Sequence, residues 1–209
     1  MVSTNVKHAF KQLRKQKLFS FINVMGLAMS MLACLLIFNY VSFEKSYDRF
    51  HTDADQLYRI FRVGPGESWD DGVASVFPGM TPVIRDRIPE VESISRLVPY
   101  DKMFSSFAFS HYLADGSDRT FNLSRGFYVD NDFLSIFTLE WTEGGGSDAL
   151  SEPGKLIISK SFADRFFGED KALGKVLNFK NMGQEFVVSG VFQDVPENSH
   201  IHFDVLLPI

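Results

Sequence analysis

The sequence has 209 residues, of which 45% are hydrophobic and 22% are charged, and its formal net charge is -5. This length allows one ordinary domain with additions or two very small domains, and the composition excludes a disordered or collagen-like chain. The charge is unevenly placed. Residues 1–43 hold five Lys or Arg and no Asp or Glu, which leaves 16 basic and 26 acidic residues after Phe43, a net charge of -10. A nucleic-acid-binding protein carries its basic surface on the folded domain, so this distribution argues against that class.

Residues 18–43 form an uncharged run of 26 residues, LFSFINVMGLAMSMLACLLIFNYVSF. A helix of that length measures about 39 Å, enough to cross a hydrocarbon core of about 30 Å. The run is too long for the apolar core of a secretory signal, and no A-x-A-type cleavage site follows it. Because five cations precede it and Glu44 follows it, the positive-inside rule predicts a transmembrane helix with a cytoplasmic N-terminus. Residues 44–209 are then extracytoplasmic.

Two features accompany the predicted span. In the basic leader, residues 1–17, apolar residues recur at helical spacing among the cations. This pattern predicts a short amphipathic helix on the cytoplasmic membrane surface, with a solvated basic leader as the alternative. Within the span, Gly26, Ser30 and Cys34 fall four residues apart on one face. Small residues at this spacing let a second helix approach closely, so we expect a helix-packing surface there.

The remaining residues alternate between strand and helix patterns. The helix is expected to continue past the membrane through EKSYDRF as a stalk that includes Glu44, Tyr47 and Phe50. Strands and short helices then interleave without a strict βαβ period, which predicts an α+β domain over residues 44–209. Because the chain stops in an apolar strand, we expect this domain to be incomplete at its C-terminus. Strands are predicted at 57–63, 94–98, 103–114, 120–129, 156–159, 172–179, 185–195 and 202–209, and helices at 77–88, 130–137 and 161–168.

Sequence patterns for catalysis or metal binding are weak. The nearest approach to a phosphate-binding loop, GEDKALGKV, has one residue too many between its glycines and Val176 where Ser or Thr would bind magnesium. No G-x-S-x-G motif for a nucleophile occurs. His200, His202 and Asp204 would share one face of a strand, but two histidines without further partners are a poor zinc pattern. We therefore expect no catalytic, cofactor or metal site.

The segment DVPENSHIHFDV has the strongest local signals for a structural corner. Asp194 and Pro196 favour a turn, Asn198 and the following serine can cap backbone groups, and His200 leads into the last strand.

Several segments in order resemble one family, the MacB/FtsX-type permeases of ABC transporters. The residues KHAFKQLRKQKLFSFINVMGLAMSM are similar to the family's basic leader and first transmembrane helix. FEKSYDRFHTDADQLYRIFRV resembles the start of its MacB-like periplasmic core domain. IPEVESISRLV, YVDNDFLSIFTLEW, ALSEPGKLIISKSFADRFFGEDKALGKVL and VVSGVFQDVPENSHIHFD follow in the family's order. The resemblance covers essentially the whole chain, although the family's later transmembrane helices have no counterpart in it.

The resemblance implies a non-catalytic permease fragment in the bacterial inner membrane. A separate cytoplasmic ABC ATPase would hydrolyse ATP, and the stalk would pass the resulting helix movement to the periplasmic domain, a mechanism called mechanotransmission. It also implies a permease dimer or pseudo-dimer in the lipid bilayer, a periplasmic or outer-membrane partner, and roles such as substrate efflux or lipoprotein release. The alternative is a membrane-tethered sensor or binding module with a single span, which would hold a self-contained ligand pocket.

Overall fold

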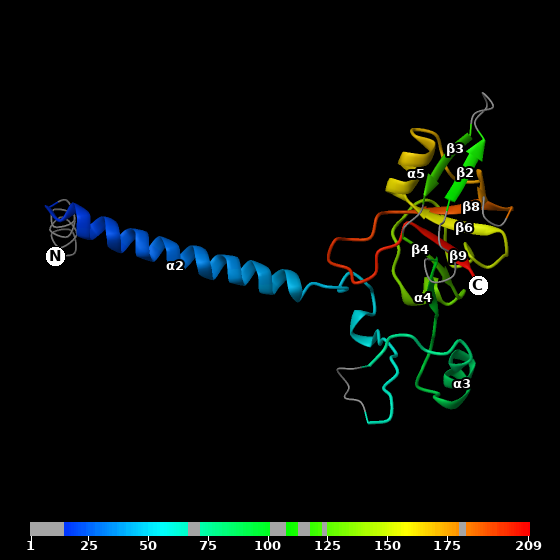
Figure 1. Ribbon diagram of the computed structural model, residues 1–209, viewed down its shortest axis with the longest axis horizontal. Helices are drawn as coiled ribbons and strands as arrows, with labels where there is room; N and C mark the ends of the chain where they lie inside the picture. The colour runs from blue at the N-terminus through cyan, green and yellow to red at the C-terminus, as the bar shows by residue number, and fades with distance from the viewer. Residues whose placement is uncertain (1–14, 67–71, 101–107, 113–117, 123–124, 180–182) are drawn as a thin grey trace. The chain divides into compact units, whose positions relative to one another are not determined.

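The computed structural model of the chain describes residues 15–66, 72–100, 108–112, 118–122, 125–179 and 183–209 (Figure 1). The chain divides into two compact units, the first ending at Tyr47 and the second running from Asp48 to Ile209. The prediction of one apolar N-terminal helix followed by a mixed α+β domain is confirmed. The expected leader helix falls mainly on residues 1–14, which lie outside the described residues.

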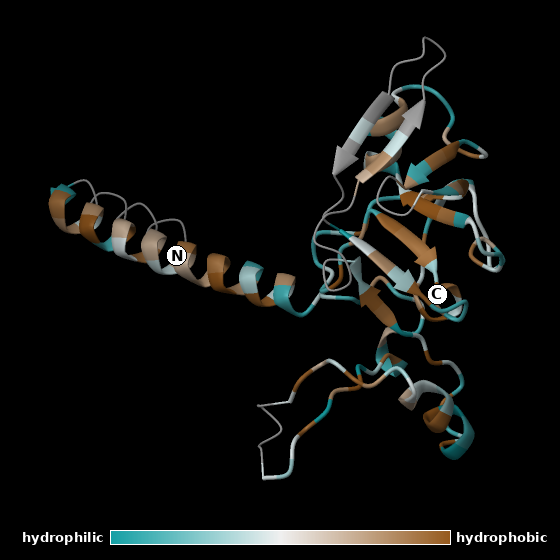
Figure 2. Cartoon of the chain, turned by 45° about the vertical axis from the view of Figure 1, so that its right-hand side comes forward, coloured by the Kyte–Doolittle hydropathy of each residue, from teal (hydrophilic) through white to brown (hydrophobic). Residues whose placement is uncertain are grey.

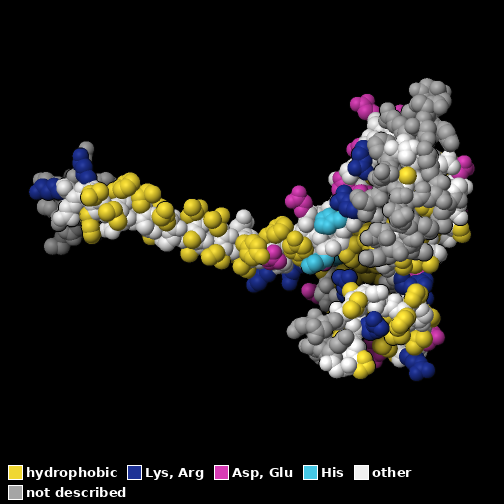
Figure 3. All heavy atoms as spheres, in the orientation of Figure 1, with side chains coloured by type: hydrophobic (Ala, Val, Ile, Leu, Met, Phe, Trp, Pro, Cys, Tyr) yellow, Lys and Arg dark blue, Asp and Glu magenta, His cyan; other side chains and the backbone are white. Residues whose placement is uncertain are grey.

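The first unit contains the long helix α2, Lys17–Glu44. None of its 28 residues is buried. Most of the helix is coloured as hydrophobic residues in Figure 2, and hydrophobic side chains recur along its visible face in Figure 3. Burying such a surface in a hydrocarbon layer is favourable, whereas exposing it to water is costly. Among the described residues, α2 is the one helix long and apolar enough to cross a membrane.

The helix ends earlier than the sequence suggests. We expected it to continue through Phe50, but α2 ends at Glu44 and residues 45–50 form turns. The reason lies in Asp48, whose φ angle of 54° is left-handed and whose N–H donates to the carbonyl of Asn198 at 3.0 Å. A helix continuing through this position would need a right-handed backbone and a bond from this N–H to Glu44. A tertiary contact therefore replaces the helical bond, and the continuous stalk helix was a wrong prediction.

The second unit is built around one mixed sheet of nine strands (Figure 1). Neighbouring strands follow the order β1-β4-β9-β6-β8-β7-β2-β3, and β5 also pairs with β8. The β4–β9 and β6–β8 pairs are parallel and the others are antiparallel. The strands are β1 Leu97–Pro99, β2 Ala108–Tyr112, β3 Asp118–Asn122, β4 Gly126–Val129, β5 Trp141–Gly144, β6 Lys155–Ser159, β7 Val176–Phe179, β8 Gln184–Phe192 and β9 Val205–Pro208.

The middle residues of β6 and the residues of β9 are apolar, because both faces of these central strands are covered. Successive side chains of a strand point to opposite faces. Leu156 and Ile158 of β6 accordingly join one hydrophobic cluster with α5, while Ile157 between them joins a second cluster on the other face. In β9, Leu206 belongs to this second cluster, which also contains Phe133 of α4. Two layers of core thus enclose the middle of the sheet.

Among the described residues, four short helices accompany the sheet, and α5 has a local signal at each end. It begins at Lys160, directly after Ser159, whose hydroxyl accepts a hydrogen bond from the Phe162 N–H at 3.2 Å. It ends at Phe167 before Gly168, whose φ angle of 69° suits a residue without a side chain. The other three are η1 Ala54–Gln56, α3 Met80–Arg87 and α4 Phe133–Ile136.

The structure differs from the predicted strands at three places. Residues 57–63 were expected to form a strand, but their only strand pairing is the single bridge from Arg62 to Val73. The strand expected over 120–129 is two strands, β3 and β4, which occupy distant positions in the sheet. The strand β5 was not predicted, because TLEWTEGGG lacks an alternating apolar pattern; its Trp141 ring covers the close approach of Gly145 to Gly190.

Candidate functional site

The first residues of the second unit, 48–52, are attached to the rest of that unit by a cluster of hydrogen bonds, which we call the clasp. It links Asp48, His51 and Thr52, near the start of the unit, to residues more than 80 positions away in the sequence. Two attachments can be distinguished, one to the corner before β9 and one to the chain directly after α4. The clasp consists of Asp48, His51, Thr52, Thr138, Ser199 and His200.

The first attachment is made by the carboxylate of Asp48. Its Oδ1 accepts a hydrogen bond from the His200 N–H at 3.0 Å and lies 3.0 Å from the Ser199 hydroxyl. Its Oδ2 lies 2.7 Å from Nδ1 of His200. The Asp48 N–H donates to the Asn198 carbonyl. Backbone and side-chain hydrogen bonds of Asp48 therefore both connect it to the corner before β9.

The charge of Asp48 is favoured by these bonds. Burial alone would raise the pKa of its carboxyl, but the hydrogen bonds from the backbone and ring of His200 and from Ser199 outweigh burial. The pKa of Asp48 therefore lies below its ordinary value, and the group is ionised at neutral pH. Asp also tolerates the left-handed backbone at this position better than most residues do.

The second attachment joins the segment to the residue after Phe137. The Thr138 N–H donates to Nδ1 of His51 at 3.1 Å, and the Thr52 N–H donates to the Thr138 hydroxyl at 2.9 Å. The His51 ring is buried and lies between the rings of Phe50 and Phe137, with centroids 4.0 and 5.1 Å away. Burial lowers the pKa of His51, while the charge of Asp48 acts weakly in the opposite direction. The ring is therefore neutral at neutral pH.

The structure distributes the expected corner residues over several contacts. Asp194 accepts a bond from the Ser161 N–H at 3.1 Å and so reaches the N-terminus of α5. The Pro196 carbonyl accepts a bond from the Ser199 N–H at 3.1 Å, which closes a turn, while Asn198 and His200 contact Asp48. The corner thus positions both α5 and the clasp.

Two of the residues considered as metal ligands, His200 and Asp204, have different partners in the protein. His200 is bound to Asp48, whereas the buried carboxylate of Asp204 pairs with Arg125 at 2.9 Å. Among the described residues, no group of three or more His, Cys, Asp or Glu is placed to hold a metal ion.

The other residues expected to have a role lie on or just after α2. Gly26, Ser30 and Cys34 are exposed along the helix, and the Ser30 hydroxyl donates to the Leu27 carbonyl at 2.9 Å. The surface expected to pack against another helix thus stays a prediction. Of the three stalk residues, Glu44 is the last of α2, Tyr47 contacts the Phe43 ring edge-to-face at 5.4 Å, and the Phe50 ring contacts His51 at a tilted angle.

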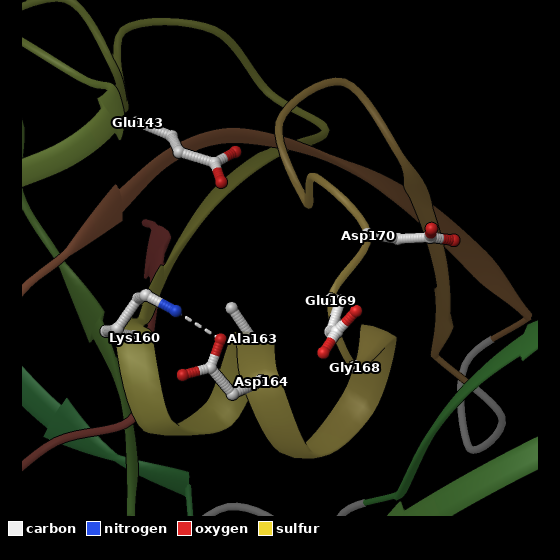
Figure 4. A pocket seen from close by; sticks show the side chains of 7 residues that line it. All are labelled: Glu143, Lys160, Ala163, Asp164, Gly168, Glu169 and Asp170. Carbon is white, nitrogen blue, oxygen red and sulfur yellow. Dashed lines mark hydrogen bonds and ion pairs between the residues drawn. The ribbon is translucent and has the colours of Figure 1, made fainter.

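A second candidate is a polar hollow of about 470 Å³ beside α5 (Figure 4). Lys160 and Asp164 form an ion pair on the helix, and Glu143 lies across the opening and accepts a bond from the Leu173 N–H at 3.2 Å. Asp170 is paired with Lys175 at 2.9 Å, outside the hollow. Lys160, Asp164 and Asp170 thus have charged partners within the protein, and the hollow offers no arrangement suited to a particular reaction.

Sequence reasoning missed the residues that form the centre of the clasp. Asp48 lies inside the expected stalk, His51 directly follows it, and Thr138 follows α4 without any motif. Asp is frequent in turns, but no local signal indicates a partner 151 residues away, such as Ser199.

Comparison with known proteins identifies the family of the chain. The family described as the MacB-like periplasmic core domain matches residues 20–209. The chain belongs to this family. A search among curated proteins finds no match.

The solved structures similar to this chain include domains of permeases and transporters. A domain of a putative permease from Porphyromonas gingivalis is 29% identical, with a TM-score of 0.49, over 62% of this chain and 51% of that one. The periplasmic region of MacB from Actinobacillus actinomycetemcomitans is 16% identical, with a TM-score of 0.40, over 56% of this chain and 48% of that one. The extracellular domain of the noncanonic ABC-type transporter YknZ from Gram-positive bacteria is 19% identical, with a TM-score of 0.45, over 63% of this chain and 62% of that one. The chain therefore spans about half to three fifths of the length of these solved chains.

The MacB-like periplasmic core domain is a domain of ABC transporter permeases, and an apolar helix followed by a mixed α+β domain is consistent with this family. Within that domain, the clasp attaches residues 48–52 to the loop after α4 and to the corner before β9.

Proposed function

We propose that this chain is the N-terminal part of a non-catalytic permease subunit of the mechanotransmission type. Helix α2 crosses the bacterial inner membrane with its N-terminus in the cytoplasm, and the second unit lies on the periplasmic side. A separate cytoplasmic ABC ATPase moves the membrane helices, and the second unit converts this movement into a periplasmic event such as substrate efflux or lipoprotein release. The permease acts as a dimer or pseudo-dimer, in which the face of Gly26, Ser30 and Cys34 packs against a neighbouring helix.

The observation that supports this proposal most strongly is the short distance along the chain between helix and clasp. Only Lys45, Ser46 and Tyr47 separate the end of α2 from Asp48. Four residue steps reach at most about 14 Å when fully extended, so a larger displacement of the helix must act on the clasp. We call these three residues the tether, and neither Gly nor Pro occurs among them. The tether and clasp thus replace the continuous stalk helix as the element that transmits movement.

A glycine insertion tests this proposal. Three glycines inserted between Lys45 and Ser46 lengthen the tether by about 10 Å while leaving α2 and the clasp residues unchanged. We expect the complete permease to keep its fold and its ATPase partner but to lose the ATP-driven movement of the periplasmic domain. The movement is measured in nanodiscs as the distance between spin labels on the domain, with and without ATP and vanadate.

The control carries the same insertion between Gly146 and Ser147, in an exposed loop away from the clasp. This variant is expected to move like the unmodified protein. Retained movement in the tether variant would contradict mechanotransmission through the tether. Failure of the unmodified chain to co-purify with an ATPase would favour the alternative of a membrane-tethered sensor.

A further inference from the structure

The contact between His51 and Thr138 exists in only one protonation state of the histidine. The Thr138 N–H is a permanent donor, and it lies 3.1 Å from Nδ1 of His51. This nitrogen must therefore offer a lone pair, so the imidazole is neutral and carries its hydrogen on Nε2. His51 is only 7% exposed and contacts two aromatic rings, of Phe50 and Phe137, which pack against the imidazole in this orientation.

We infer that His51 makes the attachment of residues 48–52 to the periplasmic domain depend on pH, holding the segment when neutral and releasing it when protonated. A proton on Nδ1 would point at the Thr138 N–H and replace an attraction by a repulsion. It would also place a positive charge in a buried aromatic site, which is unfavourable unless the charge is paired. Both effects disappear when residues 48–52 separate from the rest of the domain and water hydrates the imidazolium.

The charges around His51 do not remove this effect. Burial lowers the pKa of His51, and the negative charge of Asp48 opposes burial without cancelling it. From the other side, the contacting residues Phe137 and Thr138 carry no titratable group. Three further charged residues of its own segment line the surface hollow that His51 borders: Arg49, Asp53 and Asp55.

The direction of the pH effect follows from this lowered pKa. A released His51 takes up a proton at its ordinary pKa of about 6.5, while the attached His51 resists protonation to a lower pH. The attachment is therefore complete above about pH 6.5 and weakens as the pH falls through the pKa of the attached ring.

The other half of the clasp responds differently. Nδ1 of His200 can donate a hydrogen to the Asp48 carboxylate in both the neutral and the protonated ring, so this contact does not require a neutral histidine. The carboxylate itself, whose pKa is lowered, stays ionised until more acidic conditions. Mild acidification is thus expected to open the His51 end of the clasp first.

The consequence for transport rests on the proposed function, whereas the release itself does not. If the clasp transmits movement, acidification of the periplasm loosens the coupling between helix and domain. The release is measured on the chain without any ATPase or substrate, so its failure and the failure of mechanotransmission are distinguishable.

Hydrogen exchange of the full chain in nanodiscs tests the inference. Protection of the amides of Thr52 and Thr138 is compared at pH 7.5 and pH 5.5, after correction for the intrinsic pH dependence of exchange. At pH 5.5 a released imidazole is about ten-to-one protonated, so protection is expected to fall by up to about tenfold. In the His51→Asn variant, the amide oxygen can take the place of Nδ1 as acceptor without titrating, and we expect protection that does not change with pH.

The His202→Asn variant is the matched control, because it removes another imidazole near the clasp and should keep the pH response. Equal protection of the unmodified chain at both pH values, or the same pH response in His51→Asn, would overturn the inference. Nitrogen NMR of the unmodified chain adds a readout that needs no substitution at His51. A neutral ring with its hydrogen on Nε2 is expected at pH 7.5, and a hydrogen on Nδ1 at that pH would also overturn the inference.

Discussion

Replacing Asp48 separates two contributions to the clasp, its carboxylate and its left-handed backbone. In Asp48→Gly the carboxylate is lost, but the φ angle of 54° suits glycine. In Asp48→Ala the carboxylate is lost and a β-carbon remains in the left-handed region, which costs about 1–2 kcal/mol. Asp48→Asn keeps one acceptor oxygen and tolerates this backbone. The three variants therefore form a graded series.

The magnitudes follow from the hydrogen bonds of the carboxylate. Hydrogen bonds to a charged group contribute about 1.5–3 kcal/mol each when buried. The side chains of Asp48 and His200 are 36% and 66% exposed, so water replaces much of what is lost. We expect a loss of unfolding free energy of about 1 kcal/mol for Asp48→Asn, about 2 for Asp48→Gly and about 3 for Asp48→Ala.

Thermal unfolding of the second unit provides the assay. The full chain in detergent is heated while tryptophan fluorescence reports the unit that contains Trp141. For a domain of this size, 1 kcal/mol lowers the Tm by about 2–4 °C, so Asp48→Ala should melt about 6–12 °C below the unmodified chain. The control is Asp53→Ala, since the Asp53 side chain makes no capping hydrogen bond at η1; its Tm should change little. If the Tm of Asp48→Gly equals that of the unmodified chain, the carboxylate does not stabilise the clasp. If it equals the Tm of Asp48→Ala, the left-handed backbone conformation does not contribute.

Two substitutions test the core and a buried charge. Leu206 is fully buried in β9, so Leu206→Ala should lower the unfolding free energy by about 2–5 kcal/mol. Leu173→Ala is the control and should lower it much less, because the Leu173 side chain is 44% exposed. Urea unfolding monitored by circular dichroism measures both variants, and equal losses of unfolding free energy would contradict the two-layer core. Arg125→Ala leaves the carboxylate of Asp204, whose side chain is 8% exposed, without its ion pair and should cost about 1–3 kcal/mol. Adding Asp204→Asn should recover part of that loss in the same assay, and a double variant less stable than Arg125→Ala would show that the charge of Asp204 is stabilised by other groups.

The parts of the fold that the sequence predicted well are those set by local patterns. The uncharged run of residues 18–43 is long enough for a membrane helix, and α2 extends over it. The strand β6 and the helix α5 were predicted close to their observed positions, because an apolar run and a glycine at the end of a helix are local signals. The errors arose where the formation of a strand depends on a partner strand far away in the sequence. Residues 57–63 have the composition of a strand, but they find a strand partner only at Arg62.

The candidate site was accessible to sequence reasoning only in part. The corner before β9 carries turn and capping residues, and the structure places a turn between Pro196 and Ser199. What this corner binds could not be predicted, because Asp48 lies 151 residues away from Ser199 and has no motif of its own. The same holds for His51, whose acceptor role depends on a backbone N–H that follows α4.

By itself, the sequence determined that this protein has an apolar N-terminal helix, an α+β domain after it and the order of segments typical of a MacB-like permease. These properties depend on length, periodicity and local turn chemistry. The tertiary structure decided that the helix ends at Glu44 and that the chain is then held by a clasp instead of a continuous stalk. The physical reason is competition for one backbone group: the N–H of Asp48 could continue the helix or bind the Asn198 carbonyl, and only the folded domain brings that carbonyl within 3.0 Å.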